Sequence, residues 1–188
     1  MIALHTVTIA PPAALPVTLD ELKIYLGVQH NQADAILTRL IPAAVDIVET
    51  AIGVAGIRRT LEQRRNGFPD GRSLILGPAP LVSVASVSYR RGGESLTLAT
   101  SLYRVIVREQ GVGFIQIPAT GSWPVTDCDS DSVQVRYVAG IADGAAGLPA
   151  LFVTAVLEVA GRMFDTRGAM DGAMLARTAR DVAAPLVV

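Results

Sequence analysis

The chain has few of the residues that build disulfide-rich and metal-binding proteins. Its 188 residues include one cysteine, Cys128, and two histidines, His5 and His30. A single cysteine cannot form an internal disulfide, which excludes a disulfide-stabilised scaffold and fits a reducing compartment. Neither histidine has another histidine or a cysteine at the spacing of metal ligands, so we predict no metal and no other cofactor.

Charge is also scarce, and neither sign dominates. The 16 basic and 17 acidic residues give a net charge of -1, and charged residues make up 18% of the chain, below the roughly 25% of an average globular protein. The sequence therefore lacks the basic excess of a dedicated duplex-binding protein. With 51% hydrophobic residues, we expect part of the surface to be covered by partner subunits.

The sequence has no apolar run as long as the roughly 20 residues of a membrane-spanning helix. The apolar run around residues 148–156 is ended by Glu158. The first residues lack the basic segment that opens a secretion signal. We therefore expect a soluble protein of the cytoplasm that makes no membrane contact.

Motifs that would carry catalysis are also incomplete. Asp127, Asp129 and Asp131 have the spacing that begins a calcium loop, but Ser132 replaces its glycine and Val138 its bidentate glutamate. We interpret this cluster as a solvated turn. Because neither histidine lies in a motif that would place it beside a nucleophile, we predict that the protein is not an enzyme. An enzyme would require acidic residues from separate turns to converge.

What is present includes a long and very apolar helix, predicted over residues 149–167. Its polar positions, Thr154, Glu158, Arg162 and Asp165, form one narrow stripe, and nearly all other positions are apolar. Two interpretations remain open: a central helix covered by its own subunit, or a helix that also packs at a subunit boundary. In the second, four apolar residues form the oligomer interface: Phe152, Val156, Val159 and Met163.

Two further helices are predicted near the N-terminus. Thr18 and Glu21 match a capping box that begins a short helix, and Gly27 ends it. The next helix is capped by Asn31 and continues to about residue 52. Pro42 lies inside it and removes one backbone hydrogen bond, which predicts a bend or a restart there.

Between the helices, residues 57–142 alternate apolar and polar positions with the period of half-buried strands. Turn sequences at residues 68–71, 91–94 and 110–113 separate the strands, and a change of phase predicts a bulge near Ala85. Because the strands form one block between helices, the predicted class is α+β with antiparallel pairing. The predicted parts are an extended arm at 1–17, a helical unit from 18–56 and 143–168, an inserted β module at 57–142 and a tail at 169–188.

The densest basic group consists of four arginines: Arg58, Arg59, Arg64 and Arg65. They could form a solvated strand face with Glu62 between them, or contact DNA or an acidic partner. The sequence leaves both interpretations open.

The order of several short motifs resembles the head-tail connector, or adaptor, family of long-tailed double-stranded DNA phages. Those motifs are 16–23 (PVTLDELK), 25–28 (YLGV) with a helix beginning at Asp34, 67–69 (GFP), 76–81 (LGPAPL), 101–105 (SLYRV), 122–124 (SWP), 133–140 and 148–149. The resemblance covers roughly residues 16–168 and fits the longer form of the family, which has a β insertion. The chain departs from the family at Gly27, where a basic residue is usual, and at Pro42, where an alanine-like residue is usual.

The resemblance implies a structural protein of the particle neck, assembled in the bacterial cytoplasm. Members form a ring, usually of twelve copies, that lies beneath the portal, extends the DNA channel and docks stopper or tail proteins. Gene transfer agents use the same part. We further expect the tail to attach to the portal through six residues: Leu175, Arg177, Arg180, Leu186, Val187 and Val188. The alternative is a small monomeric module that binds a ligand on its β platform.

Overall fold

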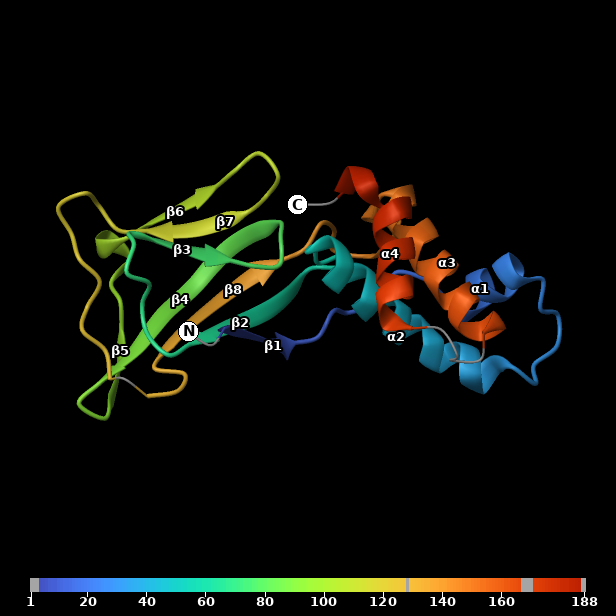
Figure 1. Cartoon of the computed structure of the whole chain (residues 1–188), viewed down its shortest axis with the longest axis horizontal. Helices are drawn as coiled ribbons and strands as arrows, with labels where there is room; N and C mark the ends of the chain where they lie inside the picture. Colours follow the sequence, from blue (N-terminus) through green and yellow to red (C-terminus); the bar gives the residue numbers. More distant parts are fainter. Residues whose placement is uncertain (1–3, 128, 167–170, 187–188) are drawn as a thin grey trace. The chain divides into compact units, whose positions relative to one another are not determined.

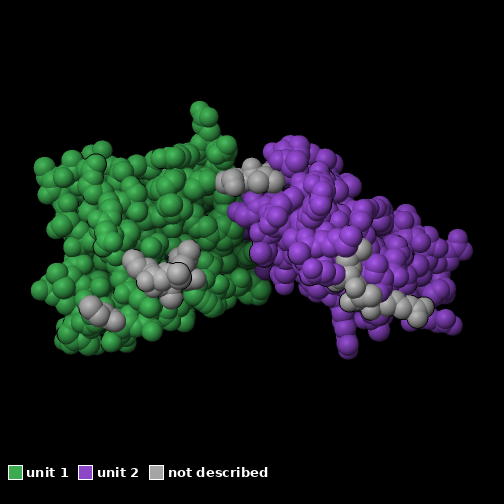
Figure 2. Space-filling model, viewed as in Figure 1, with its two compact units in different colours: residues 1–11, 59–140 green, residues 12–58, 141–188 purple. Residues whose placement is uncertain are grey.

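A computed structural model describes residues 4–127, 129–166 and 171–186, and it divides the chain into two compact units. Residues 1–11 and 59–140 form the β unit, and residues 12–58 and 141–188 form the helical unit (Figures 1 and 2). Each unit has its own cluster of buried apolar side chains. The predicted α+β class with antiparallel strands is confirmed.

The first helix, α1 (Leu19–Leu26), begins at the predicted capping box. The Glu21 backbone N–H donates to the Thr18 hydroxyl at 3.2 Å, and the Thr18 N–H donates to Glu21 Oε2 at 2.7 Å. Gly27 ends the helix with a φ of 68°, a left-handed conformation that glycine adopts without strain. Both predicted ends of this helix are therefore confirmed.

The second helix, α2 (Asp34–Ile52), differs from the prediction at its N-cap. Its N-cap is Ala33, and the Asn31 side chain instead accepts a hydrogen bond from Lys23 Nζ at 2.7 Å. Of the two outcomes expected at Pro42, the restart is excluded, because the helix continues through Pro42 as one element. Pro42 and Thr38 are both exposed, so water can reach the Thr38 carbonyl that the proline leaves without a donor.

The long apolar helix is α3 (Ala150–Asp165), preceded by a 3-10 turn, η2 (Ala145–Gly147). A fourth helix, α4 (Gly172–Val182), follows it and packs against both α2 and α3, and a last turn, η3 (Ala184–Leu186), follows α4. The interpretation of residues 169–188 as a tail separate from the helical unit is therefore wrong for the described part of that segment. Leu175, Ala179 and Ala183 follow each other at four-residue intervals and are all buried, so they form one apolar helix face. This face is hard to recognise in the sequence because most of its residues are alanines.

The β unit contains two antiparallel sheets. The large sheet has the order β1-β2-β8-β4-β5, with bounds Leu4–Ala10, Arg59–Arg65, Val133–Ala139, Leu81–Arg91 and Glu94–Thr97. The small sheet has the order β3-β7-β6, with bounds Ser73–Leu76, Gly113–Gln116 and Arg104–Val107. A 3-10 turn, η1 (Thr100–Leu102), lies between β5 and β6.

Two features of the β unit bear on the sequence predictions. The predicted bulge is confirmed, because the register between β4 and β8 shifts between Val84 and Ser86. Within the predicted extended arm, β1 pairs along β2 and belongs to the β unit. An extended strand makes few contacts with its neighbours in the sequence. Its position in the fold is therefore set by the strand with which it pairs, here β2.

The buried side chains of both sheets meet in one core, to which the large sheet contributes Leu61, Val135 and Tyr137 and the small sheet Leu74 and Ile115. The Tyr137 hydroxyl donates to the Gly77 carbonyl, and burial raises the pKa of Tyr137 to about 12. The two sheets are thus joined by polar as well as apolar contacts.

Candidate assembly surfaces

The residues predicted for the oligomer interface lie mainly inside the helical unit. Phe152, Val156 and Val159 are fully buried, and Met163 is half-buried against the same core. The covering elements are α1, α2 and α4, which all pack against α3. Buried side chains cannot contact another subunit, so an interface through Phe152, Val156 and Val159 is wrong. The first of the two interpretations, a helix covered by its own chain, describes this face of α3.

The apolar residues that do remain exposed in the helical unit come from several elements. Ile24 of α1 is the most exposed of them, at 81%. The others are Leu15, Tyr25, Ile36, Leu151 and Met174. Single exposed apolar residues are ordinary on a protein surface. At 81% exposure, Ile24 makes α1 one candidate surface for a partner.

A polar contact fixes α1 on α3. The Tyr25 hydroxyl donates to Glu158 Oε2 at 2.6 Å, and Arg162 Nε donates to Glu158 Oε1 at 2.8 Å. The hydrogen bond from Tyr25, followed by that from Arg162, lowers the pKa of Glu158, and the same carboxylate raises the pKa of Tyr25. Gly161 lies beneath, where a Cβ would be 3.4 Å from the Tyr25 ring. The face of α1 that carries Ile24 is therefore held in a defined position.

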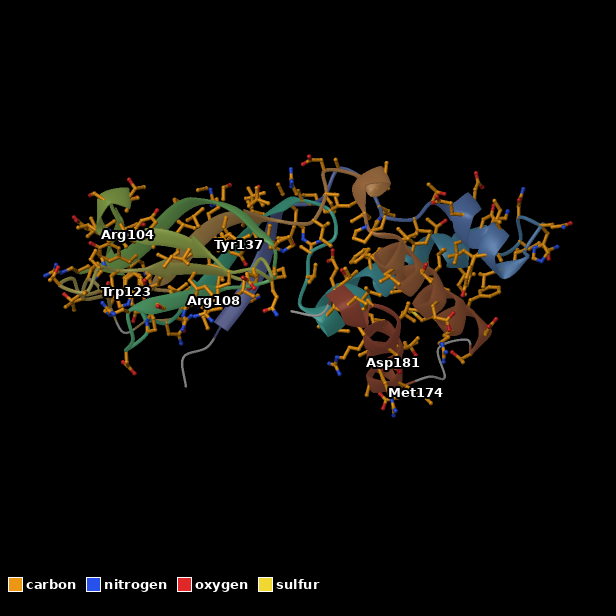
Figure 3. The ribbon with its side chains drawn as sticks, turned by 90° about the horizontal axis from the view of Figure 1, so that it is seen from above. Arg104, Arg108, Trp123, Tyr137, Met174 and Asp181 are labelled. Atoms are coloured by element: carbon orange, nitrogen blue, oxygen red, sulfur yellow. The ribbon has the colours of Figure 1, made fainter. Side chains whose placement is uncertain are left out.

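The predicted portal-binding residues lie in different surroundings, some in the core and some on the surface. Leu175 is only 5% exposed and belongs to the core, so its assignment to a partner surface is wrong. Arg180 Nε donates to the Ala51 carbonyl at 3.0 Å, and Leu186 packs against the core. Arg177 is exposed and lies 3.9 Å from Asp181 (Figure 3 labels Asp181). Val187 and Val188 lie outside the described residues.

An open groove of about 320 Å³ lies between α2 and α4. Its lining combines Asp46 and Arg180 with small and apolar residues, namely Ile47, Thr50, Ala51, Gly172 and Ala176. The groove makes this side of α4 a second candidate surface for a partner helix or loop.

The four clustered arginines do not form one basic surface. Arg58 belongs to the helical unit, and its Nη1 donates to both carboxylate oxygens of Asp143, at 2.8 and 2.9 Å. Arg59, Arg64 and Arg65 lie on β2, where Arg64 lies 2.8 Å from the buried carboxylate of Glu62. Burial lowers the pKa of Arg65. These arginines therefore have different partners and different degrees of burial, and they do not act as one basic surface.

Glu62 is the centre of a small charged cluster. Arg136 of β8 also binds its carboxylate, at 2.9 Å. Burial raises the pKa of Glu62, but the hydrogen bonds from Arg136 and Arg64 outweigh burial, so the pKa lies below its ordinary value. The interpretation of a fully solvated strand face is thus too simple, because Glu62 itself is buried.

The acidic cluster near Cys128 has structural partners. Asp127 accepts hydrogen bonds from the backbone N–H groups of Gly92 and Gly93, at 2.8 and 3.0 Å, which lower its pKa. Asp129 pairs with Arg90. Within the described residues, no group of three or more metal-ligating side chains comes together. In the same part of the chain, no helix is long and apolar enough to cross a membrane.

The sequence predicted strand β6 but not its exposure at the edge of the small sheet. Alternation predicted that Val105 and Val107 are half-buried, but all four residues of β6 are exposed. Only Tyr103, just before the strand, is buried. The signal that could have shown this is a run of three consecutive β-branched residues between Arg104 and Arg108, a pattern without a polar face.

Comparison with known proteins gives a consistent result. Residues 16–80 match the family described as phage gp6-like head-tail connector protein. This match confirms the family resemblance drawn from the sequence. Among curated proteins, none matches the chain.

The fold is similar to that of chains in three solved structures of gene transfer agent (GTA) particles. The neck of the empty particle, computed with C6 symmetry, gives a TM-score of 0.73 at 21% identity, covering 94% of both chains. A chain in the virion of the native particle gives a TM-score of 0.72 at 17% sequence identity, and the match covers 92% of this chain and 93% of the other. A chain in the neck of the native particle, computed with C12 symmetry, gives a TM-score of 0.71 at 21% sequence identity, and the match covers 94% of both chains.

Proposed function

We propose that this protein is a structural head-tail connector that forms a ring in the neck of a tailed phage or a phage-like particle such as a gene transfer agent. The observation that carries the proposal is the family match over residues 16–80, which span α1, α2 and the first strands after them. The similarity of fold to chains of the GTA neck and virion, over more than nine-tenths of both, supports it. The role is structural, without catalysis or cofactor.

The ring in this proposal has twelve copies, in agreement with the C12 symmetry of one matching neck. A closed ring requires a heterologous interface, in which one surface of a copy meets a different surface of the next. Since the inner face of α3 is covered, we assign one of these surfaces to exposed apolar residues of the helical unit, of which Ile24 is the most exposed. The ring would lie beneath the portal, extend the DNA channel and dock stopper or tail proteins.

Co-expression with the portal protein, followed by mass measurement and electron microscopy, tests the proposal. We expect a ring of this protein bound to the portal. A stable monomer that ignores the portal would contradict it and would favour the alternative, a monomeric module with a β platform.

A further inference from the structure

Strand β6 is an open and apolar edge of the small sheet. Its three β-branched residues are all exposed: Val105 at 43%, Ile106 at 38% and Val107 at 50%. In the described part of the chain, β6 pairs with β7 alone. An exposed apolar edge strand is a template for pairing with another strand, and proteins usually cover or charge such edges.

The backbone of β6 is arranged to accept another strand. The Arg108 N–H donates to the Val112 carbonyl at 3.0 Å, and the register places Ile106 opposite Phe114. In an antiparallel pair, alternate residues point their backbone groups toward the partner strand. Arg108 and Ile106 therefore face β7, and the N–H and C=O groups of Val105 and Val107 point outward.

Other sheet edges of the described chain are less suited to strand addition. At the outer edge of β3, the Gln63 side chain already bonds the strand backbone, because its Nε2 donates to the Ile75 carbonyl at 2.9 Å. The register of β1 shifts between Thr8 and Ala10, and prolines follow it directly. The remaining edge, β5, has the polar sequence ESLT.

Two arginines mark the chemistry that β6 would bind. Arg104 and Arg108 are four residues apart and share a strand face with Ile106 (Figure 3 labels both). Neither forms an ion pair within the described residues, and Arg108 lies over the Phe114 ring at 4.7 Å. The β unit contains 9 arginines against 7 acidic residues, a net charge of +2. The face thus presents a cation, an apolar residue and a second cation in sequence.

We propose that β6 is the docking site of an extended acidic segment of a partner protein, which adds to the small sheet as a strand. Its backbone would pair with Val105 and Val107, and two carboxylates four residues apart would lie beside Arg104 and Arg108. This inference rests on the proposed function only in placing the partner in the particle neck.

The observations favour a protein segment over DNA or a second copy. Phosphate groups cannot use the outward C=O groups or the apolar side chains of β6. A second copy would have to supply an acidic strand beside Arg104 and Arg108. The acidic residue of the edge strand β5, Glu94, already lies opposite Arg91 in the register with β4.

Synthetic heptapeptides provide the probe, with fluorescence anisotropy as the measurement on the full chain. The test peptide has two glutamates four residues apart and valines between them. One control peptide replaces the glutamates by glutamines, and the other carries N-methylated valines, which cannot donate backbone hydrogen bonds. We expect binding to the test peptide, a loss of roughly fivefold with glutamines and a loss above about tenfold with N-methylation.

Protein variants test the same contacts from the other side. The double substitution Arg104→Glu with Arg108→Glu should weaken binding more than about tenfold. Arg39→Glu with Arg177→Glu makes the same charge change in the helical unit and should leave binding unchanged. Val107→Pro removes an outward N–H without removing a bond to β7 and should also abolish binding, whereas Val107→Thr should not.

Several outcomes would overturn the proposal. These are no binding of the test peptide, equal binding of the N-methylated peptide, salt-sensitive duplex binding that depends on Arg104 and Arg108, or self-association through β6. The N-methylated peptide is tested on the unaltered protein, so the result stands even if a variant fails to fold. Ring formation is scored separately by electron microscopy. Rings without peptide binding refute this inference alone, and peptide binding without rings refutes the proposed function alone.

Discussion

At the scale of single residues, Gly56 shows how closely the helical unit is packed. A Cβ at this position would lie 2.5 Å from Phe152 Cζ, and the Gly56 N–H donates to the buried Glu49 side chain at 2.8 Å. Phe152 is fully buried and cannot move away freely. This close approach is part of the reason why Phe152 serves the subunit core and not a subunit boundary.

We predict that Gly56→Ala destabilises the protein by about 1–3 kcal/mol, because overpacking a rigid core forces strained side chains. Urea denaturation followed by circular dichroism measures the change. Gly144→Ala is the matched control, since nothing lies within 4 Å of the added methyl group. Equal stability of the two variants would show that the Phe152 ring can shift.

The contact between Tyr25 and Glu158 gives a prediction about pH. Tyr25→Phe should lower the free energy of unfolding at pH 7 by about 0.5–1.5 kcal/mol, because the Glu158 carboxylate loses a donor. The pKa of Glu158 is lowered in the folded state. Its contribution is therefore present above the ordinary glutamate pKa of about 4.3 and is lost as the pH falls through the lowered value.

Denaturation of both proteins at pH 7 and at about pH 3 tests this sign, since the difference between them should shrink in acid. Tyr89→Phe serves as the control, because the Tyr89 hydroxyl makes no hydrogen bond to another described residue. A difference that grows in acid would contradict the assignment of the Glu158 pKa.

At the scale of elements, α4 changes the account of the C-terminal segment. Leu175, Ala179 and Ala183 bring it into the same core as α2 and α3. Removing the segment would therefore expose part of that core as well as any partner contact. A deletion could not separate attachment from folding, and single substitutions on the two faces of α4 are the sharper test.

We predict that Leu175→Ala destabilises the helical unit by about 2–5 kcal/mol, the usual cost of truncating a buried leucine. Met174→Ala, at a neighbouring position that is 58% exposed, should change stability little (Figure 3 labels Met174). Thermal or urea denaturation distinguishes the two. A neutral Leu175→Ala would mean that α4 does not pack on the core in solution.

At the scale of the whole molecule, the charge balance gives a prediction about DNA. A protein that lines a channel must let the duplex slide, and a net charge of -1 gives little general attraction to phosphate. We expect no binding of duplex DNA by the isolated protein at physiological ionic strength, measured by electrophoretic mobility. Strong salt-dependent binding would count against the channel role.

The assignment of Ile24 to the ring interface gives a second prediction at this scale. Ile24→Glu should leave the fold unchanged, because the side chain is 81% exposed, and should prevent ring formation by placing a charge in an apolar contact. Mass photometry of the assembled ring measures the loss. Gln29→Glu, at an exposed position beyond the same helix, is the control. Normal rings from Ile24→Glu would place the interface elsewhere.

The sequence by itself determined the features that depend on neighbouring residues. The capping box at Thr18 and the glycine that ends α1 are set by local backbone geometry, and the bulge near Ala85 follows from a change of period within one strand. The α+β class followed from the order of helical and strand periods. The resemblance to head-tail connectors followed from the order of short motifs, which the match over residues 16–80 confirms.

Only the tertiary structure decided which apolar surfaces are covered. Sequence shows that α3 is apolar nearly all round, but not that α4 supplies part of its cover, because that contact joins segments separated by an unpatterned stretch. In the same way, the alternation in 103–107 predicts a half-buried strand, while its place at the edge of the small sheet exposes all of β6. Burial depends on what lies opposite a residue in space, and local periodicity carries no information about that neighbour.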